Sequence, residues 1–267
     1  MNTGLLAGKK GLIFGIGNKH SIAYGIAKSA YENGATLAIT YANDIMEKRV
    51  RPIAESFKSP LIMPCDVSSD ADINAVFAAY ESTVGQLDFV VHSVAYANAA
   101  DLSNSFSETS RAGWDLALSV SAYSLLPMAR WSKKLMTQGG SIIALSFIGG
   151  EKSVPFYNIM GVAKAALESS VRYLASELGP HNIRVNTLSP GPIKTLAGKG
   201  IKGFNFLLRL NELRSPIRRN ITQSEIGNSA VYLLSDLSSG VTGSTLYVDG
   251  GIHSIAASEA DKLLAQS

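Results

Sequence analysis

A tyrosine and a lysine in the second half of the chain have the types and the spacing of a catalytic pair. Tyr157 and Lys164 are seven residues apart. At about 100° per residue on an α-helix, this spacing brings both side chains back to nearly the same face, two turns apart. The spacing therefore predicts that a phenol and an ammonium group enter one pocket. The alternatives are a tyrosine of the core and a solvated lysine of a helix face.

The segment from Gly15 to Gly25 has the composition of a loop that holds a dinucleotide. It follows an apolar run and precedes a helical pattern. Glycines allow the backbone to approach a pyrophosphate, and the N-terminus of a helix offers free N–H groups and a positive dipole end. Ser21 stands where a third glycine is expected, and Gly25 comes later, so a plain strand–helix turn is the alternative.

Short apolar runs alternate with helical patterns along the whole chain. The runs are rich in Ile, Val and Leu and do not alternate strictly with polar residues, which is typical of parallel strands buried on both faces. The predicted strands are Gly11–Phe14, Thr36–Tyr41, Pro60–Cys65, Leu87–Val94, Ser141–Leu145, Ile183–Leu188 and Thr245–Val248. Helices are predicted from Ile22 to the stop at Asn33-Gly34, and from about Tyr157 to Leu178. This order predicts an α/β fold with a doubly wound, seven-stranded parallel sheet, helices on both faces and ligands at the carboxyl ends of the strands.

One segment interrupts this rhythm. Residues 192–216 contain glycines and amphipathic stretches but no strand, and a long insertion at the carboxyl end of a strand is where substrate lids occur. The segment is also basic. Between Pro192 and Arg219 there are seven basic residues and a single acid, Glu212. The basic residues are Lys194, Lys199, Lys202, Arg209, Arg214, Arg218 and Arg219.

The composition narrows the class of protein. The 267 residues show no linker or repeat, so residues 1–267 are predicted to form a single domain. The net charge of +3 does not favour nucleic-acid binding, and no apolar stretch approaches a membrane span. The single cysteine, Cys65, is expected to be buried, and a reducing, cytoplasmic location fits. The four histidines lack metal-ligand spacing, so no metal is predicted.

Several motifs together resemble those of the bacterial NADH-dependent enoyl-acyl-carrier-protein reductases, members of the short-chain dehydrogenase/reductase superfamily with its Rossmann fold. The resemblance covers nearly the whole chain in order. It rests on Gly-x5-Ser-Ile-Ala-x-Gly at 15–25, Cys-Asp-Val at 65–67, His-Ser-Val-Ala at 92–95, Tyr157 with Lys164, Pro-Gly-Pro-Ile-Lys-Thr-Leu-Ala at 190–197 and Val-Asp-Gly-Gly at 248–251. It implies reduction of enoyl thioesters in fatty-acid synthesis, acyl carrier protein as partner and a homotetramer.

The resemblance implies a role for individual residues around NADH. The pyrophosphate is assigned to Gly15, Ser21 and Ile22, the adenine to Asp66 and Val67, and the ribose to Ser93, Val94, Ala95 and Lys164; the nicotinamide amide and the phosphates are assigned to Ile193 and Thr195. Asp66 is alternatively a helix cap, although Ser69 or Asp70 suits that position better. At Ala42, after the second strand, the family often has glutamine. The neighbouring Asn43 and Asp44 offer no cation to a 2′-phosphate, which favours NADH over NADPH.

The same resemblance assigns the substrate pocket. Alcohol-forming members of the superfamily have Tyr-x-x-x-Lys, but the residue four before Lys164 is Met160, which cannot transfer a proton. The wider spacing to Tyr157 favours reduction of C=C over C=O. Many bacterial members have a second tyrosine at position 147, where this chain has phenylalanine, as mycobacterial relatives do. The implied pocket residues are Tyr96, Ala97, Phe147, Tyr157, Met160, Ala197, Ile201, Phe204 and Phe206. For Met160, Ala197, Ile201, Phe204 and Phe206, the alternative is packing in the core.

A mechanism follows as a hypothesis. Hydride from NADH reaches the β-carbon of a trans-2-enoyl thioester, and Tyr157 donates a hydrogen bond to the enolate oxygen that forms. Lys164 binds the nicotinamide ribose and its charge favours the developing anion. The basic stretch would dock the acidic carrier protein; the alternative is a solvated lid face. Two other functions stay open, namely a ketone or alcohol oxidoreductase of the same superfamily and a regulator that binds NAD without catalysis.

Overall fold

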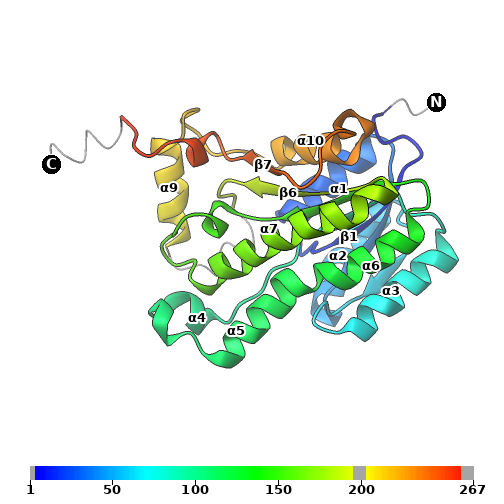
Figure 1. The fold of residues 1–267 in the computed structure, drawn as a ribbon, viewed down its shortest axis with the longest axis horizontal. Helices are drawn as coiled ribbons and strands as arrows, with labels where there is room; N and C mark the ends of the chain where they lie inside the picture. Colours follow the sequence, from blue (N-terminus) through cyan, green and yellow to red (C-terminus); the bar gives the residue numbers. More distant parts are fainter. Residues whose placement is uncertain (1–3, 195–202, 260–267) are drawn as a thin grey trace.

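The computed structural model describes residues 4–194 and 203–259 and has the predicted architecture (Figure 1). Seven parallel strands form one sheet in the order β3-β2-β1-β4-β5-β6-β7. The strands are β1 (Lys10–Phe14), β2 (Thr36–Tyr41), β3 (Ile62–Pro64), β4 (Phe89–His92), β5 (Gly140–Leu145), β6 (Ile183–Pro190) and β7 (Thr245–Val248). The prediction of a seven-stranded parallel sheet is therefore confirmed, although β3 and β4 are shorter than expected.

Helices cover both faces of the sheet. They are α1 (Ile22–Glu32), α2 (Asp44–Ser56), α3 (Asp70–Thr83), α4 (Ala99–Ser103), α5 (Arg111–Leu118), α6 (Leu125–Leu135), α7 (Ile159–Leu178), α9 (Phe204–Arg214) and α10 (Gln223–Leu234). A five-residue π-helical segment, Ser119–Tyr123, joins α5 to α6.

Period-two alternation of each buried strand divides the core into two layers. In β1, Ile13 packs in the layer of α1, α2 and α10, whereas its neighbours Leu12 and Phe14 pack in the layer of α3, α6 and α7. Every residue of β4 is buried, and so are all but the first residue of β2 and of β5. Cys65 lies within the second layer with 3% of its surface exposed, as expected. Burial raises the pKa of its thiol to about 12, so the thiol stays neutral.

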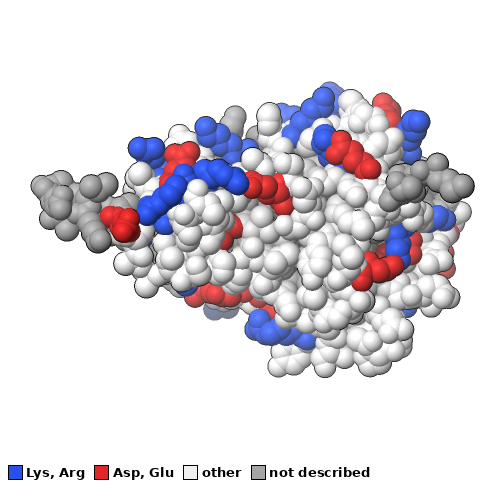
Figure 2. All heavy atoms as spheres, turned by 90° about the horizontal axis from the view of Figure 1, so that it is seen from above, with Lys and Arg blue, Asp and Glu red and all other residues white. Residues whose placement is uncertain are grey.

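The sheet topology fixes the position of the ligand site. Strand β1 pairs with β2 on one side and with β4 on the other, so the winding direction reverses between β1 and β4. In open parallel sheets, ligands bind outside the carboxyl ends of the strands at this reversal. None of the described helices is long and apolar enough to cross a bilayer. On the face shown in Figure 2, basic and acidic side chains are interspersed.

Candidate active site

The loop after β1 requires glycine at its first position. Gly15 has a φ of +98°, and a Cβ built there would lie 1.9 Å from the carbonyl oxygen of Ser93, the residue that follows β4. Only glycine combines this backbone conformation with so close an approach. Gly15 and Ser93, both predicted cofactor residues, therefore meet at the carboxyl ends of β1 and β4, where the sheet reverses.

Ser21 closes the loop rather than capping the helix that follows. Its hydroxyl donates to the carbonyl oxygen of Asn18 at 2.7 Å and accepts from the N–H of Gly17 at 3.4 Å. No side chain caps α1. The first turn of α1, beginning at Ile22, can therefore offer backbone N–H groups and its positive dipole end to a phosphate. This geometry is compatible with the pyrophosphate role predicted for Ser21 and Ile22.

The late glycine of the loop serves packing between helices. A Cβ on Gly25 would lie 2.9 Å from the Cβ of Gln223, so α10 can approach α1 only because residue 25 lacks a side chain. Gln223 also donates its side-chain amide to the carbonyl oxygens of Ser21 (2.7 Å) and Lys19 (3.2 Å). Sequence reasoning missed Gln223, because nothing in the sequence indicates that residues about 200 positions apart will meet.

The predicted adenosine residues gather at the ends of β2 and β3. The two strands pair in register at Tyr41 and Pro64, so Ala42 and Asp66 extend from the same edge. The Asp66 carboxylate accepts from the N–H and the hydroxyl of Ser68, while Ser69 caps α3 by accepting from the N–H of Asp72. Ser69 is thus the cap that its position predicted, and Asp66, with the buried Val67 beside it, stays free of that task.

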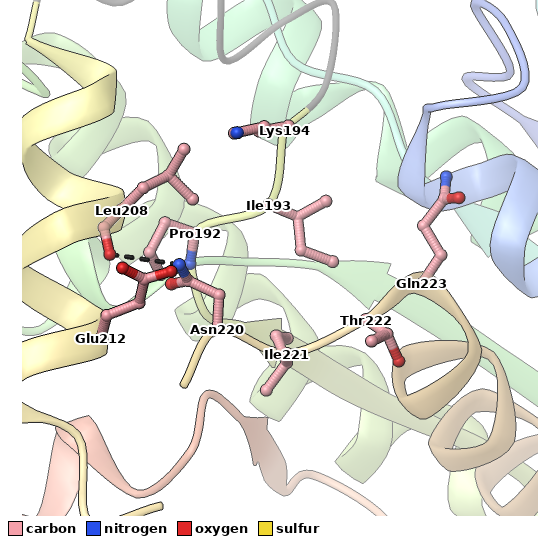
Figure 3. A pocket seen from close by; sticks show the side chains of 9 residues that line it. All are labelled: Pro192, Ile193, Lys194, Leu208, Glu212, Asn220, Ile221, Thr222 and Gln223. Carbon is pink, nitrogen blue, oxygen red and sulfur yellow. Dashed lines mark hydrogen bonds between the residues drawn. The ribbon is translucent and has the colours of Figure 1, made fainter. Parts of the chain in front are cut away.

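The nicotinamide end of the predicted site lies along the segments after β4 and β6. Val94 and Ala95 follow Ser93 beyond β4, and Ile193 follows β6. A cavity of about 340 Å³ separates the segment after β6 from α9 and the start of α10. Figure 3 shows Ile193 within this cavity and Gln223 directed toward the loop that precedes α1. Thr195 and the predicted pocket residues Ala197 and Ile201 lie outside the described residues.

Tyr157 is not on a helix, and the prediction of one shared helical face was wrong. Helix α7 begins at Ile159, and the turn before it contains two non-glycine residues with positive φ, Phe156 (64°) and Asn158 (39°). The Asn158 side-chain amide donates to the carbonyl oxygens of Asp101, Leu102 and Asn104. These contacts hold a backbone conformation that most residues avoid, and so they place Tyr157 outside the helical path.

The phenol of Tyr157 is buried but available. Only 8% of the residue is exposed, and its hydroxyl has no hydrogen-bond partner among the described residues. Burial raises the pKa of this phenol, and Glu168 raises it further, so Tyr157 remains a proton-bearing donor at neutral pH. The hydroxyl retains some contact with solvent, which suits a group that donates to substrate once water is displaced.

Lys164 is held just beneath the end of β5. It is 5% exposed, and its ammonium donates to the carbonyl oxygen of Leu145 at 2.6 Å. An ammonium has three donors, so two remain for ligand hydroxyls. Burial lowers the pKa of Lys164 to about 8, opposed by the negative charge of Glu168. Nearby His92 is fully buried, and burial together with Lys164 lowers the pKa of its imidazole to about 3, so His92 stays neutral.

An apolar cluster surrounds Tyr157. The ring of Phe147 packs edge-on against that of Tyr157 with 4.8 Å between centroids, and Met160 is buried in the same cluster. Ala97 joins it as predicted, whereas Tyr96 is 54% exposed. Sequence reasoning missed four further members, Leu102, Leu118, Val154 and Ala163. Their apolar character was visible, but α4 and α5, which bring Leu102 and Leu118 to the site, gave no strong periodic signal.

The predicted lid contains a helix that starts beside the turn that carries Tyr157. Gly203 precedes α9, and a Cβ built on it would lie 2.8 Å from the ring of Phe156. The helix α9 therefore begins next to the turn that carries Tyr157, with Phe204 as its first residue. Phe206, two residues further, is 56% exposed. Within the described part of the chain, no group of acidic, histidine or cysteine side chains could hold a metal ion.

Comparison with known proteins places these features in a family. Residues 15–253 match the family model described as enoyl-(acyl carrier protein) reductase. The chain is 49% identical over 251 residues to the enoyl-[acyl-carrier-protein] reductase [NADH] FabI of Bacillus cereus, covering 93% of this chain and 98% of that protein. It is also 49% identical over 252 residues to the corresponding [NADPH] FabI of Staphylococcus aureus, covering 94% and 98%.

A solved structure agrees with the sequence comparison. The enoyl-acyl-carrier-protein reductase of Anaplasma phagocytophilum in complex with NAD superposes with a TM-score of 0.93 at 46% identity, covering 97% of this chain and 99% of that one. The family resemblance seen in the motifs is confirmed, and the match extends over the loop after β1, the catalytic turn and α9. The chain belongs to the enoyl-(acyl carrier protein) reductase family.

Proposed function

We infer that this protein reduces the trans-2 double bond of enoyl-acyl-carrier-protein thioesters with NADH, in the elongation of fatty acids. The observation that carries this function is the phenol of Tyr157, which has no protein partner among the described residues and lies on the turn that leads into the helix of Lys164, with Met160 at the position four before the lysine. A methionine there leaves Tyr157 as the proton-bearing group that faces substrate. The apolar cluster around it suits an acyl chain rather than a polar alcohol.

The residues of this chain would do three things in the reaction. Tyr157 donates its hydrogen bond to the thioester oxygen, where negative charge grows as the β-carbon is reduced. Lys164 uses its two remaining donors on the ribose hydroxyls and so fixes the position of the ring. Phe147 and Met160 exclude water from the reacting carbon atoms. Bound NADH supplies the hydride, which is the demanding chemical step.

The preference for NADH is supported by the end of β2. Ala42 has no side chain that could reach a 2′-phosphate, and the amide of Asn43 is used as the cap of α2, accepting from the N–H of Met46. On α2, Asp44 at the start of the helix carries a charge that would repel a 2′-phosphate, whereas Lys48 and Arg49 lie a full turn or more beyond it, and Arg51 is paired with Glu47. Overall similarity does not indicate the cofactor, because a relative named for NADH and one named for NADPH are both 49% identical to this chain. The preference for NADH is therefore supported by the residues after β2.

The function is tested by following NADH absorbance with two thioesters. Rapid oxidation with a crotonyl thioester and none with an acetoacetyl thioester is expected. The reverse pattern would identify a ketone reductase, and NADH binding without turnover of either would identify a non-catalytic regulator. The same assay with NADPH is expected to give a much lower kcat/KM.

Phe147 is expected to act only through its apolar ring. Because the ring lies edge-on against Tyr157 and has no donor, Phe147→Tyr should change kcat/KM by less than tenfold, or less than ~1.4 kcal/mol of transition-state free energy. Phe147→Ala should do worse, mainly through KM for longer acyl chains. Steady-state kinetics across chain lengths measure both. If Phe147→Tyr restored activity to Tyr157→Phe, the two positions would be interchangeable and Tyr157 would not be the sole donor.

Acyl carrier protein is the proposed partner, docking on the basic stretch between Lys194 and Arg219. Lys194, Arg209, Arg218 and Arg219 are exposed, but Arg209 pairs with Glu212 and Arg219 with Glu225. Figure 2 shows basic and acidic side chains side by side on this face. The net positive charge available to an acidic partner is thus smaller than the residue count suggests, and Lys199 and Lys202 lie outside the described residues.

Docking by charge predicts a salt dependence that differs between substrates. The rate on a carrier-protein thioester should fall with ionic strength more steeply than the rate on a coenzyme A thioester. Arg209→Glu and Lys202→Glu should lower kcat/KM only for the carrier-protein substrate. The matched control is Lys28→Glu, because Lys28 is an exposed helix lysine that is paired with Glu32 as Arg209 is with Glu212. Parallel salt curves for both substrates would contradict the proposed docking.

A homotetramer is proposed from two apolar surfaces that a single chain leaves uncovered. On the helices α5, α6 and α7, the exposed residues include Trp114, Leu126 and Tyr173, the last with 78% exposure. At the sheet edge, β7 is only half-buried, and Leu237 nearby is 64% exposed. Two different self-complementary faces produce a tetramer with three two-fold axes. Light scattering should give four chains, and Tyr173→Glu should give dimers.

A cytoplasmic location is proposed, because the single cysteine, Cys65, is a free thiol and a reducing compartment suits it.

A further inference from the structure

A buried glutamate on α7 has no part in the mechanism above. Glu168 is 5% exposed and lies one helical turn beyond Lys164. Its carboxylate accepts a hydrogen bond from the hydroxyl of Ser146, which is equally buried. A Cβ on Gly150 would lie 3.0 Å from this carboxylate, so the segment after β5 covers it closely. Burying a carboxylate is costly unless it interacts with a charge or donors.

The end of β5 is contacted at three successive residues by the catalytic segment. Lys164 donates to the carbonyl of Leu145, Glu168 accepts from Ser146, and Tyr157 packs against Phe147. Residues four apart on a helix lie on one face, which is why α7 reaches two consecutive residues of the strand end. The carboxylate therefore belongs to the same arrangement that positions the phenol and the ammonium.

We propose that Glu168 is a positioning residue for the reduction, which supplies the negative charge that keeps the buried Lys164 ammonium protonated and anchors α7 to the end of β5. This inference rests on the proposed function, because it assigns Lys164 to the ribose of NADH. An ammonium beneath a hydrophobic sheet loses its hydration, and a fixed carboxylate one turn away restores part of the lost stabilisation.

The other charged and titratable groups around this pair do not replace Glu168. His92 of β4 is neutral, with its pKa lowered to about 3. Tyr157 is a protonated phenol, and Tyr247 of β7 is one as well, because burial and its contact with Glu151 raise its pKa. The pKa of Glu168 itself is raised, chiefly by burial and then by Glu151, while the hydrogen bond from Ser146 and the charges of Arg172 and Lys164 lower it.

Lys164 itself responds to Glu168 directly. Burial lowers the pKa of Lys164 to about 8, and Glu168 is the group that opposes this decrease. A neutral residue at 168 would therefore lower the pKa of Lys164 further. Above that pKa the lysine is uncharged and holds the ribose less strongly, so NADH affinity should decline as pH rises through about 8 in the wild-type enzyme.

The test is a set of NADH titrations by fluorescence between pH 6 and pH 9.5, which need no acyl substrate. Glu168→Gln keeps the shape of the side chain and removes its charge, and we expect its alkaline decline to begin at a lower pH, with affinity weaker than that of the wild type between the two midpoints. Ser146→Ala removes the hydrogen bond and leaves the charge, so its midpoint should match the wild type. Glu168→Asp should also keep the wild-type midpoint.

Each outcome of these titrations either supports or contradicts a role for the charge of Glu168. A Glu168→Gln midpoint equal to that of the wild type would overturn the proposal, as would an equal displacement in Ser146→Ala, because packing rather than charge would then be responsible. If Glu168→Gln does not fold, Glu168→Ala takes its place: a midpoint that is lowered in Glu168→Ala but not in Glu168→Asp supports a role of charge, and an unmoved midpoint in Glu168→Ala refutes it. Wild-type enzyme that binds NADH with the expected decline but does not reduce a crotonyl thioester would refute the proposed function and leave the role of Glu168 intact.

Discussion

Replacing Tyr157 with phenylalanine is expected to reduce kcat on an enoyl thioester by about 10²–10³-fold, the typical effect of losing one oxyanion donor. The hydroxyl has no partner among the described residues, so its removal leaves no protein group unpaired and the fold should be unaffected. NADH affinity should stay close to that of the wild type, because the assigned role of the phenol begins only when charge develops on the substrate. Single-turnover kinetics with crotonyl thioester, together with NADH titration, measure the two effects.

Lys164→Ala is the variant with which Tyr157→Phe should be compared. Lys164 is assigned to the ribose, so its loss should weaken NADH binding as well as turnover. The two variants should therefore differ in NADH affinity but both lose turnover. Equal losses of NADH affinity in both would show that the phenol and the ammonium do not divide the work as proposed.

Gly15→Ala should damage both the fold and the cofactor site. The φ of +98° is unfavourable for alanine, and the new Cβ would lie 1.9 Å from the carbonyl oxygen of Ser93, so the ends of β1 and β4 must move apart. The conformational part alone costs about 1–3 kcal/mol of unfolding free energy. In a domain of this size each kcal/mol lowers the melting temperature by roughly 2–4 °C. NADH affinity should fall by well over tenfold, because both shifted segments are assigned to the cofactor.

Gly17→Ala is the matched control, two residues further in the same loop. A Cβ on Gly17 would meet no atom within 4 Å. This variant should melt at the wild-type temperature, whatever it does to phosphate binding. The comparison uses thermal denaturation without cofactor and fluorescence titration with NADH. Wild-type melting and affinity in Gly15→Ala would contradict the close approach of β1 and β4.

The sheet was predictable because the composition of each strand indicates how deeply it is buried. Strands buried on both faces must be apolar throughout, so runs such as 36–41 and 141–145 are visible without any partner. The weak points were strand ends. β4 stops at His92, where its chain leaves the sheet for the ligand crevice, although the apolar run continues through Val94. Val94 still packs against the second layer of the core, so a local apolar pattern does not show where the strand itself ends.

The candidate site was only partly predictable, because several of its residues acquire a role through distant contacts. Periodicity suggested that Tyr157 continues the helix of Lys164, but the conformation of Asn158 is set by three carbonyl groups of the α4 region, more than fifty positions earlier. Gln223 and Glu168 escaped notice for the same reason. The count of basic residues has a related weakness. It includes Arg209 and Arg219, but in the structure these side chains are paired with Glu212 and Glu225.

The turn at Asn158 also bears on how such enzymes diverge. If the phenol were displaced by one turn along a continuous helix, exchanging two side chains would move an ancestor between alcohol chemistry and double-bond chemistry. Here the phenol leaves the helix altogether, and its backbone is held by α4 and the residue after it, which also bring Leu102 into the apolar cluster around Tyr157. Placing tyrosine at position 160 would therefore put a hydroxyl on a buried helical face already filled against Ser121, with Tyr157 still in place. Because the turn and its anchor, rather than the helix, place the phenol, a substitution at position 160 alone should not convert this site to alcohol chemistry.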